Sequence, residues 1–106
     1  MKFIEQSLPG VFLIEPEPFT DDRGVFRRHF CQDEFKKYGI ANQVQQANVS
    51  ENKYAYTLRG FHYQLTPFGE GKTLSCLKGK IYDIIVDLRK DSPTYMKWIS
   101  FELNDE

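Results

Sequence analysis

The strongest constraint on the fold is an alternating pattern between residues 73 and 88, interrupted once by a glycine turn. Residues 73–77 and 81–88 flank Lys78-Gly79-Lys80, where Gly79 can supply the positive φ that a tight turn requires. In the second segment, one alternating set is apolar and the other contains Asp83 and Asp87. This pattern predicts an antiparallel β-hairpin of residues 73–77 and 81–88, and a fold built mainly from strands.

The rest of the chain shows the same short alternating runs between turn signals. They predict strands at residues 11–15, 25–30, 44–50, 57–64 and 97–103, with turns at residues 21–24 and 91–93. Residues 32–38 are the exception, because Phe35 and Tyr38 lie at helical spacing and Gly39 follows as a helix stop. We therefore expect an all-β, antiparallel sandwich with one helix of about two turns, in a single domain of residues 1–106.

Charge and hydropathy exclude several classes of protein. The 14 basic and 15 acidic residues leave a net charge of −1, without the basic excess expected for binding nucleic acid or an anionic membrane. No apolar run approaches the roughly 20 residues of a membrane-spanning helix, and the N-terminus does not resemble a secretory signal. Cys31 and Cys76 are too few for a disulfide framework, so we expect reduced thiols in a cytoplasmic protein.

One of the two histidines lies in a segment crowded with polar groups. In residues 57–64, Gly60 separates Arg59 from His62, and a bulge at this glycine would turn both side chains toward one cavity. Residue types alone also allow a structural histidine beside a surface arginine, and this alternative stays open.

The predicted hairpin also places two charged residues near each other. If Lys78 and Gly79 are the central turn residues, Lys72 and Asp83 are diagonal neighbours on one face. An inward-facing pair would be costly unless it served a function. A solvated outer face is the alternative.

The sequence lacks the residue patterns of a metal site, a cysteine nucleophile and a phosphate-binding loop. His62 is followed by Tyr63-Gln64 and not by a second imidazole, so we expect no metal site. Neither cysteine has a histidine placed to activate it, and Gly69-Glu70-Gly71-Lys72 lacks the spacing of a phosphate-binding loop.

Several ordered motifs together resemble one known family. They are Leu8-Pro9-Gly10-Val11, Asp22-Arg23-Gly24-Val25-Phe26, Gln46-Ala47-Asn48, Leu58-Arg59-Gly60-Phe61-His62-Tyr63-Gln64, Gly71-Lys72, the run of residues 79–89, and Ser92-Pro93-Thr94-Tyr95. Taken in this order, they closely resemble the dTDP-4-dehydrorhamnose 3,5-epimerases, which have a cupin (jelly-roll) fold. The resemblance runs nearly from end to end.

The resemblance implies epimerisation of C3 and C5 in a 4-keto-6-deoxyhexose linked to dTDP, without a metal or organic cofactor. It makes His62 the general base, Lys72 the residue that stabilises the enolate oxygen, and Asp83 the carboxylate near it. These residue types suit the reaction, because a weakly acidic α-proton is removed more easily when the developing enolate is stabilised. The implied substrate contacts are Arg23 and Arg59 for the diphosphate or sugar, Gln46 and Asn48 for the sugar or phosphate, and Phe26 for a thymidine platform completed across a homodimer interface.

The chain also departs from the family pattern. Arg28 stands where the family carries an acidic residue, and Val49 follows Asn48 where the family carries a histidine. The family's tyrosine acid and the aspartate that orients its histidine are expected beyond Glu106, so we expect a cupin domain without its C-terminal segment. The sequence thus predicts either a weakly active or inactive form of the epimerase or a non-catalytic cupin module that binds a nucleotide sugar or self-associates.

Overall fold

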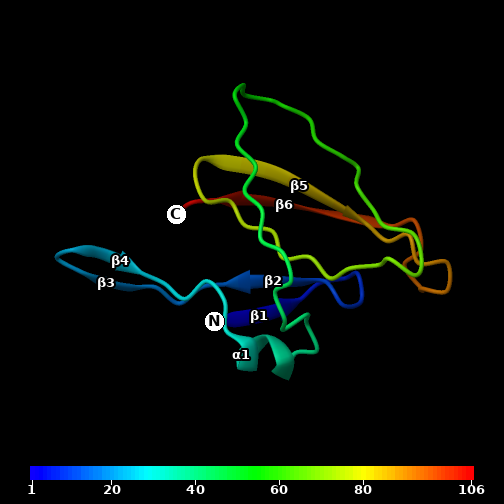
Figure 1. Ribbon diagram of the computed structural model, residues 1–106, viewed down its shortest axis with the longest axis horizontal. Helices are drawn as coiled ribbons and strands as arrows, with labels where there is room; N and C mark the ends of the chain where they lie inside the picture. The colour runs from blue at the N-terminus through cyan, green and yellow to red at the C-terminus, as the bar shows by residue number, and fades with distance from the viewer.

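The computed structural model describes residues 1–106, and its regular secondary structure consists of antiparallel strands and one short helix (Figure 1). The elements are β1 (Lys2–Glu5), β2 (Phe12–Glu15), β3 (Phe19–Asp21), β4 (Gly24–Phe26), α1 (Gln32–Lys37), β5 (Lys80–Val86) and β6 (Trp98–Asn104). The strands pair as three two-stranded sheets, β1–β2, β3–β4 and β5–β6. This arrangement confirms the prediction of an all-β, antiparallel chain with one short helix.

The apolar core lies where α1 packs on β1 and β2. Phe35 is the buried residue of the helix, and its ring contacts Phe3 edge-on at 5.5 Å and Phe30 at 4.8 Å. Tyr38 stacks on Phe3 with ring centroids 4.4 Å apart. The helix is followed by Gly39 at a φ of +67°, a conformation that favours glycine, so the predicted helix and its stop are confirmed.

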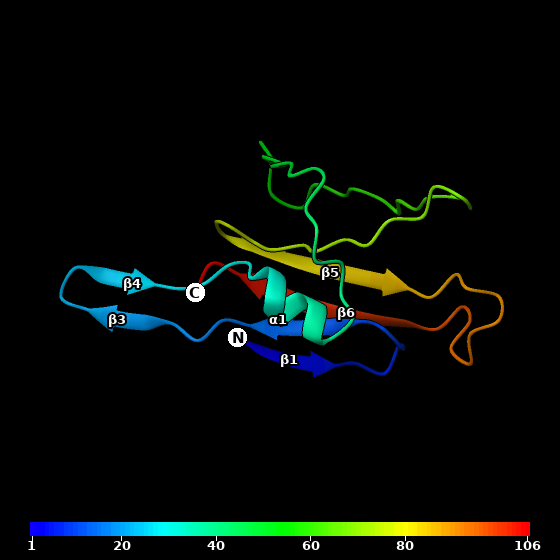
Figure 2. The ribbon, with the colours of Figure 1, turned by 60° about the horizontal axis from the view of Figure 1, so that its bottom comes forward.

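The β3–β4 hairpin projects from this core, and residues 19–26 are called the arm below. Figures 1 and 2 show it extending away from the other strands at one end of the molecule. Phe19 pairs with Phe26 and Asp21 with Gly24, and the turn between them is the one predicted at residues 21–24. The predicted strand at 25–30 ends at Phe26, because the chain then leaves the hairpin to bring Phe30 against Phe35.

The predicted partner of residues 81–88 is wrong. β5 pairs with β6 over seven residue pairs, from Lys80 with Asn104 to Val86 with Trp98, and residues 73–77 form no strand. The bend at Gly79 is present, with a φ of +85°, but alternation defines only the faces of a strand and not its partner. The alternating run of β6 offers seven pairs, more than five residues at 73–77 could provide.

Residues 41–79 form a long irregular stretch, so the predicted strands at 44–50 and 57–64 are also wrong. Figure 2 shows this stretch looping on the far side of β5 from β1 and β2. A strand is stabilised by cross-strand neighbours and by burial of one face, and these segments have neither, because their side chains are exposed. Both cysteines are free, and no helix is long and apolar enough to cross a membrane.

Candidate functional site

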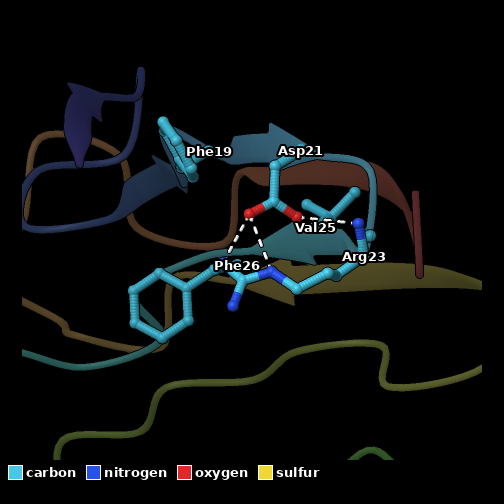
Figure 3. A pocket seen from close by; sticks show the side chains of 6 residues that line it. Phe19, Asp21, Arg23, Val25 and Phe26 are labelled. Atoms are coloured by element: carbon cyan, nitrogen blue, oxygen red, sulfur yellow. Dashed lines mark hydrogen bonds and ion pairs between the residues drawn. The ribbon is translucent and has the colours of Figure 1, made fainter.

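The arm brings together two of the predicted substrate-binding residues. An open hollow of about 410 Å³ is lined by Phe19, Asp21, Arg23, Gly24, Val25 and Phe26. Figure 3 shows the Arg23 side chain folded back toward Asp21 along the hairpin. Arg23 Nη2 lies 2.6 Å and Nε 3.1 Å from Asp21 Oδ2. These hydrogen bonds hold the pKa of the Asp21 carboxyl below its usual range, so this carboxyl is ionised at neutral pH.

The two phenyl rings of the arm are its most unusual surface feature. Phe19 is 66% and Phe26 76% exposed. Because they are directly opposed across the β3–β4 ladder, they lie on the same face of the hairpin. An exposed aromatic face beside a guanidinium group can stack a planar ring and bind an adjoining anion.

A second hollow of about 280 Å³ shares these rings on the side nearer the core. Met1, Glu17 and Arg28 complete its lining. The Met1 amine donates to Glu17 Oε2 at 2.7 Å and to Glu34 Oε1 at 3.2 Å. Arg28 Nη1 donates to the other oxygen of Glu34 at 3.0 Å. Met1, Glu17, Arg28 and Glu34 form a charge cluster, which includes one residue from each segment that connects the arm to the core.

The polar residues predicted for the sugar end lie in the irregular stretch, and all are exposed: Gln46, Asn48, Arg59 and His62. Arg59 Nε donates to Asn52 Oδ1 at 2.6 Å, which fixes its direction within the stretch. Gly60 has a φ of +116°. Since residues 57–64 form no strand, this glycine does not create the predicted bulge, and no side-chain hydrogen bond joins Arg59 to His62.

Lys72 and Asp83 are not the diagonal pair that the hairpin register predicts. Lys72 Nζ lies 3.1 Å from Glu70 Oε1, and this contact lowers the pKa of Glu70. Asp83 stands on β5 opposite Phe101, half-buried on the face that also carries Ile81 and Ile85. The register that would bring Lys72 beside Asp83 is absent because residues 73–77 form no strand. No side-chain hydrogen bond or ion pair joins His62, Lys72 and Asp83 to one another.

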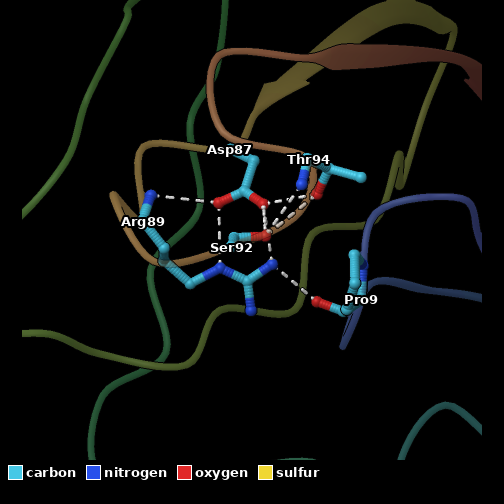
Figure 4. Close-up of polar contacts among 5 residues, drawn as sticks. All are labelled: Pro9, Asp87, Arg89, Ser92 and Thr94. Carbon is cyan, nitrogen blue, oxygen red and sulfur yellow. Dashed lines mark hydrogen bonds and ion pairs between the residues drawn. The ribbon is translucent and has the colours of Figure 1, made fainter.

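One polar cluster emerges that the sequence did not reveal as a unit. The Asp87 side chain, in a residue only 4% exposed, accepts hydrogen bonds from Arg89 Nε at 2.9 Å, Ser92 Oγ at 2.5 Å and Thr94 Oγ1 at 2.6 Å (Figure 4). Arg89 Nη2 also donates to the Pro9 carbonyl at 2.8 Å.

The Asp87 cluster joins the two main hairpins, because it links the loop after β5 to the turn between β1 and β2. Its donors, Arg89 first, hold the pKa of Asp87 far below the usual aspartate range. The only sequence feature that could have indicated this cluster is the close spacing of Asp87, Arg89, Ser92 and Thr94. However, the spacing does not indicate that all three side chains bind one carboxylate. No group of three or more His, Cys, Asp or Glu side chains is placed to hold a metal ion.

Comparison with known proteins gives one consistent answer. A sequence model described as dTDP-4-dehydrorhamnose 3,5-epimerase matches residues 5–106. The chain is 37% identical over 107 residues to the dTDP-4-dehydrorhamnose 3,5-epimerase of Shigella flexneri, covering 100% of this chain and 59% of that protein. It is 42% identical over 106 residues to that of Sinorhizobium fredii, covering 100% of this chain and 54% of that protein.

Solved structures agree with the sequence comparisons. The crystal structure of dTDP-4-dehydrorhamnose 3,5-epimerase from Bacillus anthracis with TDP and PPi bound superimposes with a TM-score of 0.92 at 39% identity, covering 98% of this chain and 59% of that chain. The expected cupin-type, all-β fold is thereby confirmed. The chain spans little more than half the length of the curated relatives it matches.

Proposed function

Because the chain belongs to the dTDP-4-dehydrorhamnose 3,5-epimerase family, we propose that it acts on a dTDP-4-dehydro-6-deoxysugar by removing protons α to the C4 ketone. The observation that carries the proposal is the arm, where two exposed phenyl rings and Arg23 surround an open hollow in a chain of this family. A nucleoside diphosphate presents a planar base and a dianionic diphosphate, which suit such a surface.

At the nucleotide end, Phe26 supplies a platform on which the thymine ring stacks. Arg23 binds the diphosphate, and it can leave Asp21 for this stronger anion because the pair is exposed to solvent. Arg59 lies on the irregular stretch with its guanidinium held by Asn52, and it supplies a second cation for the diphosphate or sugar. Gln46 and Asn48 provide amide contacts to the sugar or phosphate.

At the reacting end, His62 takes the proton from C3 or C5, and the bonding electrons move onto the C4 oxygen to form an enolate. The Lys72 ammonium stabilises this oxyanion, and Asp83 helps to hold Lys72 there. Reprotonation of the carbon on its opposite face completes the inversion. The proposal requires His62, Lys72 and Asp83 to face the bound sugar together. No metal or organic cofactor takes part in these steps.

The proposed partner is a second copy of the chain. The rings of Phe19 and Phe26 are exposed to solvent at the base of a projecting hairpin, and exposed apolar side chains on an unpaired strand edge favour association. A homodimer would complete the thymidine platform. The net charge of −1 supports a protein that binds neither nucleic acid nor an anionic membrane, and we propose a cytoplasmic location.

One observation favours a second candidate, a non-catalytic module that binds a nucleotide sugar. The arm forms its hollow without help from other segments, whereas His62, Lys72 and Asp83 make no mutual contact. In this alternative, dTDP binds to the arm and no proton is removed from the sugar.

Proton exchange separates the two candidates. The dTDP-linked 4-keto-6-deoxysugar is incubated with protein in D2O, and loss of the C3 and C5 proton signals is followed by NMR. We expect exchange with the wild type and with His29→Ala, whose histidine contacts Ser75 instead, and no exchange with His62→Ala. Exchange that survives in His62→Ala would contradict the assigned base. Binding of dTDP without exchange in the wild type would support the binding module.

A further inference from the structure

The arm has little apolar contact with the rest of the protein. All its side chains are exposed, and β3 and β4 pair only with each other. Its position is therefore set by the two legs that connect it to the core, residues 16–18 before β3 and residues 27–30 after β4. Figure 2 shows both legs entering the molecule near the start of β1 and the first turn of α1.

Both legs are tied to one carboxylate of α1. Arg28, two residues after Phe26, donates to Glu34 Oε2 at 3.0 Å. Glu17, two residues before Phe19, accepts from the Met1 amine, and that amine also donates to Glu34 Oε1 at 3.2 Å. Glu34 thus uses one oxygen for each leg, and it stands on a helix fixed to the core by Phe35.

The contacts of Glu34 with Arg28 and with the Met1 amine require an ionised carboxylate at position 34. Arg28, and then the Met1 amine, lower the pKa of Glu34, while Glu34 raises the pKa of Arg28. The side chains of Met1 and Glu34 are 2% and 30% exposed, so solvent screens the contact between the Met1 amine and Glu34 less than it screens a surface ion pair. The Arg28 side chain is 62% exposed, so its contact with Glu34 is screened more. A neutral amide at position 34 would leave two cations facing one remaining carboxylate.

Glu34 itself lines neither hollow. The hollow on the core side is lined by Arg28, Glu17 and Met1, all members of the charge cluster, together with Phe19 and Phe26. A shift of either leg therefore changes the distance between the two rings and Arg28. An effect of Glu34 on ligand binding has to pass through these residues.

We infer that Glu34 is a positioning residue for the nucleotide end of the site: by binding Arg28 and the Met1 amine at once, it fixes the two legs of the arm and with them the rings of Phe19 and Phe26. This inference rests on the proposed function, since it assigns the arm to dTDP. It predicts that neutralising Glu34 weakens nucleotide binding and leaves the proton-transfer step unchanged.

The first test compares dTDP affinity by isothermal titration calorimetry, using protein with a free N-terminus and any affinity tag at the other end. Energetic coupling of this kind predicts that Glu34→Gln binds dTDP about 2–30-fold more weakly than the wild type. The matched control is Glu5→Gln, which removes an exposed glutamate at the end of β1 away from Met1 and should leave the affinity unchanged. A wild type that does not bind dTDP would defeat the proposed function, whereas equal affinities of wild type and Glu34→Gln would overturn this inference alone.

The second test distinguishes positioning from a general loss of stability. In the proton-exchange assay, Glu34→Gln should raise the substrate concentration giving half-maximal exchange and leave the maximal rate as in the wild type. The variant Arg28→Lys keeps a cation beside Glu34, so it should bind dTDP more tightly than Arg28→Ala. A fall in the maximal rate of Glu34→Gln with unchanged half-saturation, or equal affinities of Arg28→Lys and Arg28→Ala, would contradict the inference.

Discussion

Replacing Phe35 with alanine tests whether the contact between α1 and the β1–β2 hairpin is the main apolar anchor of this chain. Phe35 is 1% exposed, and Leu8 is the only other apolar residue that is fully buried. The Phe35 ring meets the Phe3 ring edge-on, and its centroid lies 4.8 Å from that of Phe30. Truncating a buried phenylalanine costs about 3–5 kcal/mol of unfolding free energy. Domains of this size have roughly 5–15 kcal/mol in total, so the variant should lose a large part of its stability.

Thermal unfolding followed by circular dichroism measures this loss. Since each kcal/mol lowers the Tm of a domain near this size by roughly 4–8 °C, Phe35→Ala should melt about 12–40 °C below the wild type. Phe68→Ala is the control, because Phe68 is 72% exposed in the irregular stretch and its loss should shift the Tm by only a few degrees. A Phe35→Ala variant that melts within about 3 °C of the wild type would refute the assignment of the core.

Three further predictions concern charge, binding and assembly. Arg89 holds the pKa of Asp87 below the ordinary value of 3.8, so the ionised Asp87 carboxylate stabilises the fold above pH 3.8 and this stabilisation is lost as the pH falls below that value. The free energy of unfolding of Asp87→Asn should therefore depend less steeply on pH in acid than that of the wild type, and an unchanged dependence would count against this role of Asp87. Arg23→Ala should bind dTDP about 10–100-fold more weakly by calorimetry, since one charge-assisted hydrogen bond is worth about 1.5–3 kcal/mol, and equal affinity would remove Arg23 from the site. Phe19→Asp, at an exposed position of the face that we propose self-associates, should convert the proposed homodimer to monomer in sedimentation equilibrium, and a wild type that is monomeric at micromolar concentration would contradict the proposed dimer.

Local signals in the sequence predicted local structure well. The turn at residues 21–24 and the helix ending at Gly39 are recognisable because glycine conformation and helical spacing act within a few residues. The pairing of β5 was wrong because alternation is a property of one strand, whereas the choice between residues 73–77 and β6 depends on a comparison of two partners. β1 was missed for a related reason, since its Phe3 becomes informative only when Phe35 and Tyr38 pack on it.

The candidate site also contains residues whose proximity follows from a local turn and residues whose positions depend on long-range packing. Arg23 and Phe26 lie on one tight hairpin, so their proximity follows from the local turn. His62, Lys72 and Asp83 lie on two segments whose relative position depends on long-range packing, and their roles stay predictions. The Asp87 cluster and the tie between Glu34 and Arg28 could not be predicted from spacing, because side-chain burial and the shared carboxylate depend on the folded chain.

The proposed role of His62 as the base that removes the α-proton is tested most directly by proton exchange at C3 and C5, followed by NMR with the dTDP-linked 4-keto-6-deoxysugar in D2O. A positioned general base typically accelerates proton transfer about 10²–10⁴-fold. We therefore predict that His62→Ala loses α-carbon exchange by at least this factor and still binds dTDP. Exchange in His62→Ala at the wild-type rate would contradict the assignment of His62 as the base.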